Sequence, residues 1–348
     1  MQFCLEIFMS KLAKAYNLAL NKFSKQTNSH FFKKAIEHSN EISTIQDNTN
    51  LIGSDDIILF CTMKNEAHRL EFFIDYYEKL GVDSFIFVDN ASTDNTKSLL
   101  SSRDNVSLFY TDASYKDSNF GMHWVNFLLS KYGVNHWCLT CDPDEFIVYP
   151  HMETRDLIDL TQYLDSIKQE SFFTTMLDMY SDKPVNQTIY EPATDPLKVC
   201  KYFDGYGYSK SYNHAITNLF VQGGVRKRIF SRNTPSSSPA LNKVPLVKWK
   251  KNYAYISSMH MLLPKKLNRC IDERMVTGAL LHFKFISQLD NKVREEMLAK
   301  QHYNDSAEYK QYGDVINAQG LLYNPNVSIP FVGWQDLARR GLLNVGGW

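Results

Sequence analysis

Between residues 55 and 145 the sequence alternates short apolar runs with segments of helical spacing. The run at 57–62 (IILFCT) is almost continuously apolar, as expected for a strand buried on both faces. Similar runs follow at 84–88, 106–110 and 137–141, and helical patterns separate them at 66–80, near 97–101 and at 120–132. Strands that alternate with helices predict a parallel sheet with right-handed crossovers, and therefore an α/β fold.

Composition limits the class of protein. The chain has 348 residues, of which 44% are hydrophobic and 22% charged, which is typical of a globular protein. No apolar run approaches the roughly 20 residues that a membrane-spanning helix needs. The first 25 residues lack the pattern of a cleaved secretory signal, so we expect a cytoplasmic protein, with the inner face of the membrane as a second option.

The net charge is zero, but the charged residues are unevenly distributed along the chain. Lys+Arg and Asp+Glu both number 38, yet residues 205–271 contain no Asp or Glu and twelve Lys or Arg. Such a segment concentrates positive potential, which attracts phosphate groups. The alternative is a solvated face whose acidic partners lie in the rest of the chain. No nucleic-acid-binding motif accompanies these bases, so we expect no nucleic-acid partner.

Polar side chains follow each predicted strand. They are Lys64-Asn65-Glu66, residues 89–94, Asp112 and residues 142–145. In parallel α/β sheets, ligands bind beyond the carboxyl ends of the strands, so these groups mark one candidate site. Neither a Gly-x-Gly-x-x-Gly loop nor a Walker loop follows the first strand, so the two common phosphate-binding loops are missing.

Asp142-Pro143-Asp144 places two carboxylates at positions i and i+2, which point the same way in extended chain. Close carboxylates repel each other unless a proton or a cation separates them, and oxygen ligands suit Mg²⁺ or Mn²⁺. An ordinary acidic turn is the alternative. His282, in the apolar run at 278–285, is either a buried core residue or a third ligand from the far side of the cleft.

Three motifs in this order resemble the nucleotide-diphosphosugar glycosyltransferases of the GT-A fold, in the form of a bacterial family-2-like branch. They are KNE at 64–66, VDNASTDNT at 88–96 and CDPDEF at 141–146. Later segments are also similar: LDMYSD at 177–182, GGVRKRIF at 223–230, KVPLVKW at 243–249 and GALLHFKF at 278–285. The resemblance implies a GT-A-like α/β fold, a Rossmann-like mostly parallel sheet flanked by helices.

The predicted domains follow from the extent of this resemblance. We expect a helical N-terminal extension over residues 1–50 and a glycosyltransferase domain over 51–290. Within that domain, 55–150 form the nucleotide half and 151–290 the acceptor half. Residues 291–348 are expected to form a helical or irregular C-terminal extension.

The resemblance also implies an activity. It is transfer of a sugar from a nucleoside-diphosphate sugar, expected to be a UDP-sugar, to a glycan or lipid-linked acceptor, with Mn²⁺ or Mg²⁺ as cofactor. Inversion at the sugar, bacterial surface polysaccharide synthesis and a peripheral membrane contact are further expectations. The alternatives are a sugar-1-phosphate nucleotidyltransferase and a non-catalytic module that binds sugar nucleotides or glycans.

Carried over to this sequence, the resemblance and the charge pattern nominate three sets of site residues. Nucleotide-sugar binding is expected from Thr62, Lys64, Asn65, Glu66, Arg69, Asp89, Ser92, Asp94, Asp142, Arg226 and Arg228. Metal binding is expected from Asp142, Asp144 and His282. The catalytic candidates are Asp178 and Asp182, because Asp178 follows a strand-like run and would reach the same edge; a surface acid is the alternative.

Overall fold

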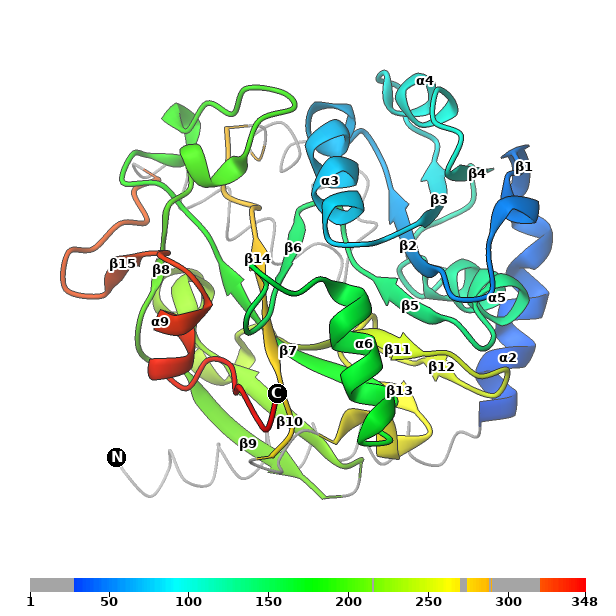
Figure 1. Cartoon of the computed structure of the whole chain (residues 1–348). Helices are drawn as coiled ribbons and strands as arrows, with labels where there is room; N and C mark the ends of the chain where they lie inside the picture. The colour runs from blue at the N-terminus through cyan, green and yellow to red at the C-terminus, as the bar shows by residue number, and fades with distance from the viewer. Residues whose placement is uncertain (1–27, 215, 270–273, 288, 290–319) are drawn as a thin grey trace.

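The computed structural model describes residues 28–214, 216–269, 274–287, 289 and 320–348. Within these residues the centre of the fold is a nine-stranded sheet with the strand order β1-β4-β3-β2-β5-β11-β7-β14-β6 (Figure 1). The strands are β1 (Ser43–Gln46), β2 (Ile57–Met63), β3 (Ser84–Asn90), β4 (Val106–Thr111), β5 (Trp137–Thr140), β6 (Glu145–Val148), β7 (Ser171–Asp178), β11 (Asn242–Lys248) and β14 (Gly278–His282).

Most strands of the sheet run in one direction. The four strands β4, β3, β2 and β5 pair in parallel, and β7 pairs in parallel with β14. β11 lies antiparallel between β5 and β7 and therefore gives these two the same direction, whereas β1 and β6 are antiparallel at the two edges. The predicted α/β fold with a mostly parallel sheet is therefore confirmed.

Helices cover both faces of the sheet. The α-helices are α2 (Asn28–Glu37), α3 (Ala67–Lys79), α4 (Thr96–Ser101), α5 (Met122–Tyr132), α6 (Leu157–Ser166) and α9 (Trp334–Arg339). Because β5 lies on the other side of β2 from β3 and β4, the right-handed crossover through α5 falls on the face opposite α3. Figure 1 shows α2 beside α5, and the two helices are in contact.

Smaller elements complete the fold. Three two-stranded sheets pair β8 (Tyr202–Asp204) with β15 (Ser328–Pro330), β9 (Ser209–Asn213) with β10 (Asn218–Gln222), and β12 (Ala254–Tyr255) with β13 (Leu262–Leu263). Single-turn helices are η1 (His38–Glu41), η2 (Thr49–Leu51), η3 (Val185–Gln187), η4 (Pro196–Lys198), η5 (Arg226–Phe230), η6 (Pro235–Ser237) and η7 (Lys265–Asn268). None of the helices in the described ranges is long and apolar enough to span a bilayer.

Apolar spacing explains how α3 is attached. Its residues Leu70, Phe73, Ile74 and Tyr77 recur at helical intervals and are buried. The Phe73 ring lies 5.9 Å from that of Phe146 on β6 and 6.5 Å from that of Phe87 on β3. The first turn of α3 is therefore held above the carboxyl ends of β2 and β3, where the sequence predicts a site.

The strands and helices predicted between residues 55 and 145 occur within about two residues of the expected places. Three strands of the sheet were not predicted. β1 comes from the predicted N-terminal extension and pairs with β4, β6 follows the acidic turn directly, and β11 is antiparallel. Residues 1–27 and 290–319, which include much of both predicted extensions, lie outside the described residues, and the boundaries at 50 and 290 stay predictions.

Strand β14 packs closely against its neighbours β6 and β7, and a substitution can test this packing. A Cβ atom at Gly278 would lie 2.5 Å from the carbonyl oxygen of Val148 and 2.7 Å from the ring of Phe172. We expect Gly278→Ala to lower the free energy of unfolding by about 1–3 kcal/mol, because backbone atoms must shift to admit the methyl group. Urea denaturation would measure this loss, and an unchanged midpoint would contradict the packing described for β14.

Candidate functional site

Glu145 stabilises the acidic turn at residues 142–145, between β5 and β6, through two hydrogen bonds to Asp142. Its backbone N–H donates to the carbonyl oxygen of Asp142 (3.0 Å), and the backbone N–H of Asp142 donates to Oε2 of Glu145 (3.3 Å). Glu145 is buried, whereas the side chains of Asp142 and Asp144 are 43% and 17% exposed. The turn therefore presents both predicted metal-binding carboxylates beyond the end of β5.

Strand β14 brings His282 to this turn. In the register of the sheet, His282 lies opposite Glu145 on β6 and Asp178 on β7. Its Nδ1 lies 2.7 Å from Oδ1 of Asp178, and its Nε2 lies 3.3 Å from Oδ2 of Asp144. Burial alone would lower the pKa of His282, but the carboxylates of Asp144 and Asp178 outweigh burial and raise it to about 9. The imidazole is therefore protonated at neutral pH in this structure.

Asp178, at the end of β7, has a fully buried side chain with both oxygens engaged. Oδ1 accepts from His282, and Oδ2 accepts from Nε of Arg226 (2.8 Å). Burial alone would raise the pKa of Asp178, but Arg226 and His282 lower it to about 2. Such a carboxylate is a weak proton acceptor, so the geometry favours a role in orienting His282. A catalytic role for Asp178 stays a prediction without support from these contacts.

Asp182, the second predicted catalytic carboxylate, lies in the exposed segment after β7. Its Oδ1 accepts a hydrogen bond from the hydroxyl of Ser181 (3.3 Å). The side chain is accessible to a substrate, in contrast to Asp178, and its catalytic assignment also stays a prediction.

Six side chains form a chain of alternating charge across the carboxyl edge of the sheet. We call this set the charge chain, and its members in order are Glu66, Arg69, Asp144, His282, Asp178 and Arg226. Nε of Arg69 lies 2.9 Å from Oε2 of Glu66, and Nη1 of Arg69 lies 3.9 Å from Oδ2 of Asp144. Each inner member therefore has opposite charges on both sides, which offsets the cost of removing it from water.

Hydrogen bonds tie together the turns that follow β2 and β3. The backbone N–H of Asn65 donates to the hydroxyl of Ser92 (2.9 Å), and that of Thr93 donates to Oδ1 of Asn65 (2.7 Å). The N–H of Ala67, in the first turn of α3, donates to Oδ2 of Asp94 (3.1 Å). The structure thus brings the predicted nucleotide-binding residues Asn65, Ser92 and Asp94 together, where they shape the edge of the sheet.

Thr62 and Asp89 lie at the carboxyl ends of β2 and β3. Asp89 is 1% exposed, and its Oδ1 accepts from the N–H of Ser92 (3.0 Å). The Thr62 hydroxyl is buried and has no hydrogen-bond partner among the described residues. Lys64, one residue beyond β2, is exposed. These residues share the edge with the acidic turn, and nucleotide binding by them stays a prediction.

Gly121 lets the loop before α5 approach the Thr62 hydroxyl closely. It has a φ of 77°, a left-handed conformation that favours glycine, and a Cβ there would lie 3.0 Å from Oγ1 of Thr62. The sequence analysis did not single out Gly121, although a glycine just before a helix is a usable signal for a close approach.

Both arginines predicted to bind a diphosphate are paired with buried aspartates. Arg226 belongs to the charge chain through Asp178. Arg228 lies outside it, and its Nε and Nη2 donate to Oδ2 and Oδ1 of Asp204 at 2.7 and 2.8 Å. These ion pairs give both arginines a clear structural role, and diphosphate binding by them stays a prediction.

Six of the twelve bases of the acid-free segment 205–271 form ion pairs with acidic side chains elsewhere in the described part of the chain. The pairs are Arg226 with Asp178, Arg228 with Asp204, Lys243 with Glu145, Lys248 with Asp165, and Lys250 and Lys266 with Glu170. These contacts favour the second interpretation of the charge pattern, in which the partners lie in the acidic remainder, over a free phosphate-gathering surface.

Sequence reasoning missed Lys243 as a member of the site, and it placed Glu145 at the edge without giving it a role. Nζ of Lys243, on β11, forms an ion pair with Oε1 of Glu145 and lies 3.3 Å from Oδ2 of Asp142. Lys243 is 3% exposed. The usable signal was a single lysine within the mostly apolar run LNKVPLV, because a buried ammonium group needs an acidic partner.

The donor set at the acidic turn fits a divalent cation in part. Within the described ranges, no three His, Cys, Asp or Glu side chains are arranged to hold a metal ion. Asp142 turns toward Lys243, and Asp144 lies against His282. A carboxylate on Nδ1 of a histidine is the usual support for a metal-binding imidazole, and Asp178 provides it. Asp144 and His282 therefore suit a cation that takes its other ligands from substrate and water, and the predicted set of three stays a prediction.

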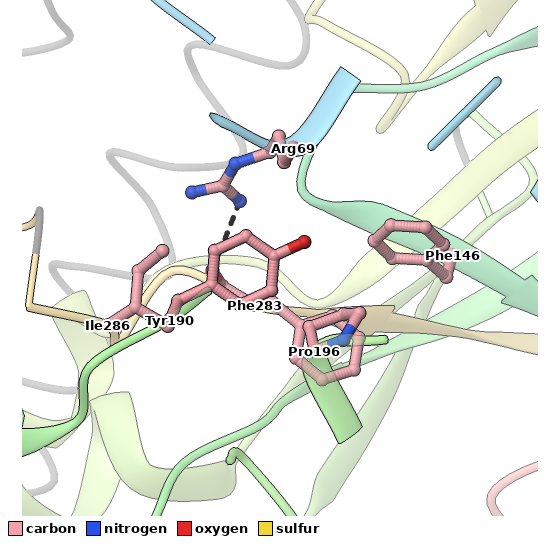
Figure 2. Close-up of a pocket in the computed structure, with 6 residues that line it drawn as sticks. All are labelled: Arg69, Phe146, Tyr190, Pro196, Phe283 and Ile286. Atoms are coloured by element: carbon pink, nitrogen blue, oxygen red, sulfur yellow. Dashed lines mark hydrogen bonds between the residues drawn. The ribbon is translucent and has the colours of Figure 1, made fainter. Parts of the chain in front are cut away.

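A small pocket lies beside Arg69 (Figure 2). It is lined by Arg69, Phe146, Tyr190, Pro196, Phe283 and Ile286. Nη1 of Arg69 donates to the carbonyl oxygen of Phe283 (3.2 Å), the bond drawn in Figure 2. The wall of the pocket is mostly apolar, and Arg69 is held within the charge chain by Glu66 and by the carbonyl oxygen of Phe283.

The raised pKa of His282 predicts how stability depends on pH in EDTA. A histidine titrates near 6.5 when unfolded and near 9 here, so its contribution is complete below about pH 6.5 and is lost as the pH rises through 9. We expect the free energy of unfolding of the wild type to fall by roughly 3 kcal/mol more than that of His282→Gln between about pH 6 and pH 10. Urea denaturation over this range measures the difference, and parallel curves would contradict the protonated state of His282.

Comparisons with known proteins add little to this geometry. No family model matches the sequence, and no curated protein matches it. Among solved structures, the chain is similar to glucosyl-3-phosphoglycerate synthase from Mycobacterium tuberculosis, described in complex with Mn²⁺, uridine diphosphate and glucosyl-3-phosphoglycerate. The match has a TM-score of 0.23 and 16% identity, and it covers 36% of this chain and 44% of that one. A likeness of this extent carries no argument about this protein.

Proposed function

We propose that the protein is a metal-dependent glycosyltransferase that moves a sugar from a nucleoside-diphosphate sugar, a UDP-sugar, to an acceptor hydroxyl. The observation that supports this most is the meeting of Asp144 and His282 at the carboxyl edge of the sheet, with Asp178 behind the imidazole. Asp89 and Thr62 end neighbouring strands at the same edge, where a nucleotide would lie next to the cation.

Asp144 and His282 would hold the cation. A bound Mn²⁺ or Mg²⁺ stabilises the negative charge that the departing diphosphate gains as the bond to the sugar breaks. Asp178 fixes the imidazole so that Nε2 faces Asp144, and Arg226 keeps Asp178 ionised. The orientation of these side chains is already present in the structure before any substrate binds.

Asp89 would accept a hydrogen bond from the base or the ribose, and the Thr62 hydroxyl would gain the partner that it lacks among the described residues. An inverting reaction needs a carboxylate to take the proton of the acceptor hydroxyl. Asp182 is the better placed candidate, because it is exposed whereas Asp178 is buried. In this proposal the acceptor is a glycan or a lipid-linked sugar of bacterial surface polysaccharide synthesis, and the enzyme works in the cytoplasm.

A panel of ligands tests the function directly. Ligands that bind the folded state raise the melting temperature, so uridine diphosphate with Mn²⁺ should raise it more than either alone. Release of uridine diphosphate from UDP-sugars without an acceptor would then indicate a transferase. Pyrophosphate release would indicate a nucleotidyltransferase instead, and binding without hydrolysis would indicate a binding module.

Asp144 is the most informative single position. We expect Asp144→Asn to reduce turnover of the UDP-sugar by at least about 100-fold, because the substitution removes the charge of a metal ligand while keeping its shape. Asp165→Asn is the matched control, since Asp165 is 42% exposed and pairs with Lys248 on the surface. Turnover of Asp144→Asn close to that of the wild type in Mn²⁺ would contradict the metal assignment.

A further inference from the structure

The two carboxylates of the acidic turn have different cationic partners. Oδ2 of Asp142 lies 3.3 Å from Nζ of Lys243, and Oδ2 of Asp144 lies 3.3 Å from Nε2 of His282. An imidazole nitrogen is a common metal ligand, whereas an ammonium group has only donors and cannot coordinate a metal ion. The turn is therefore asymmetric before any ligand is present.

Lys243 is held in place by the buried carboxylate of Glu145. Its side chain is 4% exposed, and Nζ forms an ion pair with the fully buried Glu145. The other oxygen of Glu145 accepts the backbone N–H of Asp142, so one buried carboxylate holds both the lysine and the turn. The ammonium group is thus a fixed charge that cannot move to solvent.

The strand order explains why a lysine can reach this place. β11 lies antiparallel between β5, which leads into the turn, and β7, which ends at Asp178. Lys243 is near the start of β11. In the register with β5 it lies just beyond the carboxyl end of that strand, whereas on the other side it pairs with Thr174 in the middle of β7. An antiparallel strand in the middle of the sheet therefore places the ammonium group of Lys243 beside the acidic turn.

We propose that Lys243 is a positioning residue that gives the two carboxylates of the acidic turn different roles, holding Asp142 as a neutralised hydrogen-bonding group so that the cation is bound through Asp144. The inference rests on the proposed function. It deepens that function by selecting Asp144 over Asp142 as the metal ligand and by adding a fixed positive charge near the diphosphate.

The test uses a double variant, because Lys243→Met alone would leave Glu145 buried and unpaired. Lys243→Met with Glu145→Gln removes both charges at similar volume, and the glutamine oxygen can still accept the N–H of Asp142. Replacing a buried ion pair by neutral side chains of similar size is often tolerated, so we expect a cooperative unfolding transition. Lys248→Met with Asp165→Asn is the matched control. Lys248 is on β11, as Lys243 is, and its partner Asp165 is on α6; their side chains are 36% and 42% exposed.

Mn²⁺ and uridine diphosphate are titrated separately by calorimetry into the wild type and both variants. The site variant leaves the net charge of the turn unchanged, but Asp142 loses its cationic partner and the nearby ammonium group is gone. We therefore expect Mn²⁺ to bind about tenfold more tightly and uridine diphosphate about tenfold more weakly. The control should change neither constant. A merely structural role of Lys243 would weaken both ligands together.

Any outcome other than tighter Mn²⁺ with weaker uridine diphosphate in the site variant overturns the inference and leaves the proposed function standing. A wild type that binds neither ligand, whether they are added separately or together, overturns the proposed function and this inference with it.

Discussion

The charged side chains of the charge chain are paired with neighbours of opposite sign, and this pairing decides how the carboxyl edge of the sheet is built. The charge chain joins α3, the acidic turn, β14, β7 and η5 through contacts of 2.7 to 3.9 Å. Loss of one partner would leave the next charge buried and uncompensated, which costs several kcal/mol in proteins. The position of each strand end is thus tied to that of its neighbours, and residues far apart in the sequence are held in register by electrostatics as well as by the sheet.

The parallel half of the sheet was predictable because its strands are buried on both faces. β2 and β3 are almost continuously apolar, and one amphipathic helix separates them, so the pattern leaves little choice of fold. Two of the three missed strands, β1 and β11, lack this continuous apolar run. β1 is a four-residue edge strand of mostly exposed residues, and β11 contains Pro245, around which its pairing with β7 shifts register. Whether these segments form strands depends on the partner already in place, which a local pattern does not contain.

The candidate site could be predicted only to the extent that the ends of the strands could be predicted. Polar residues after β2, β3 and β5 meet at one edge because parallel strands end together, and the acidic turn was located on this ground. The partners of these residues depend on register between distant strands, as for His282 and Asp178, which are 104 positions apart. The same limit applies to Arg226 and Arg228. Their position in an acid-free stretch of sequence predicted that they bind a ligand, but in the fold they pair with buried aspartates. Sequence spacing thus located the chemistry of the edge but not the distribution of charge within it.

That distribution bears on how ligands would bind. With His282 protonated, the charge chain holds three acidic and three basic groups, and Lys243 offsets one of the two further carboxylates of the acidic turn. An edge that is nearly compensated attracts neither a bare divalent cation nor a bare diphosphate strongly, since either one adds an unbalanced charge to a poorly solvated site. A cation and a diphosphate that arrive together nearly cancel each other. The arrangement of the edge therefore favours joint binding of the metal ion and the nucleotide, because the protein already neutralises most of its own charges.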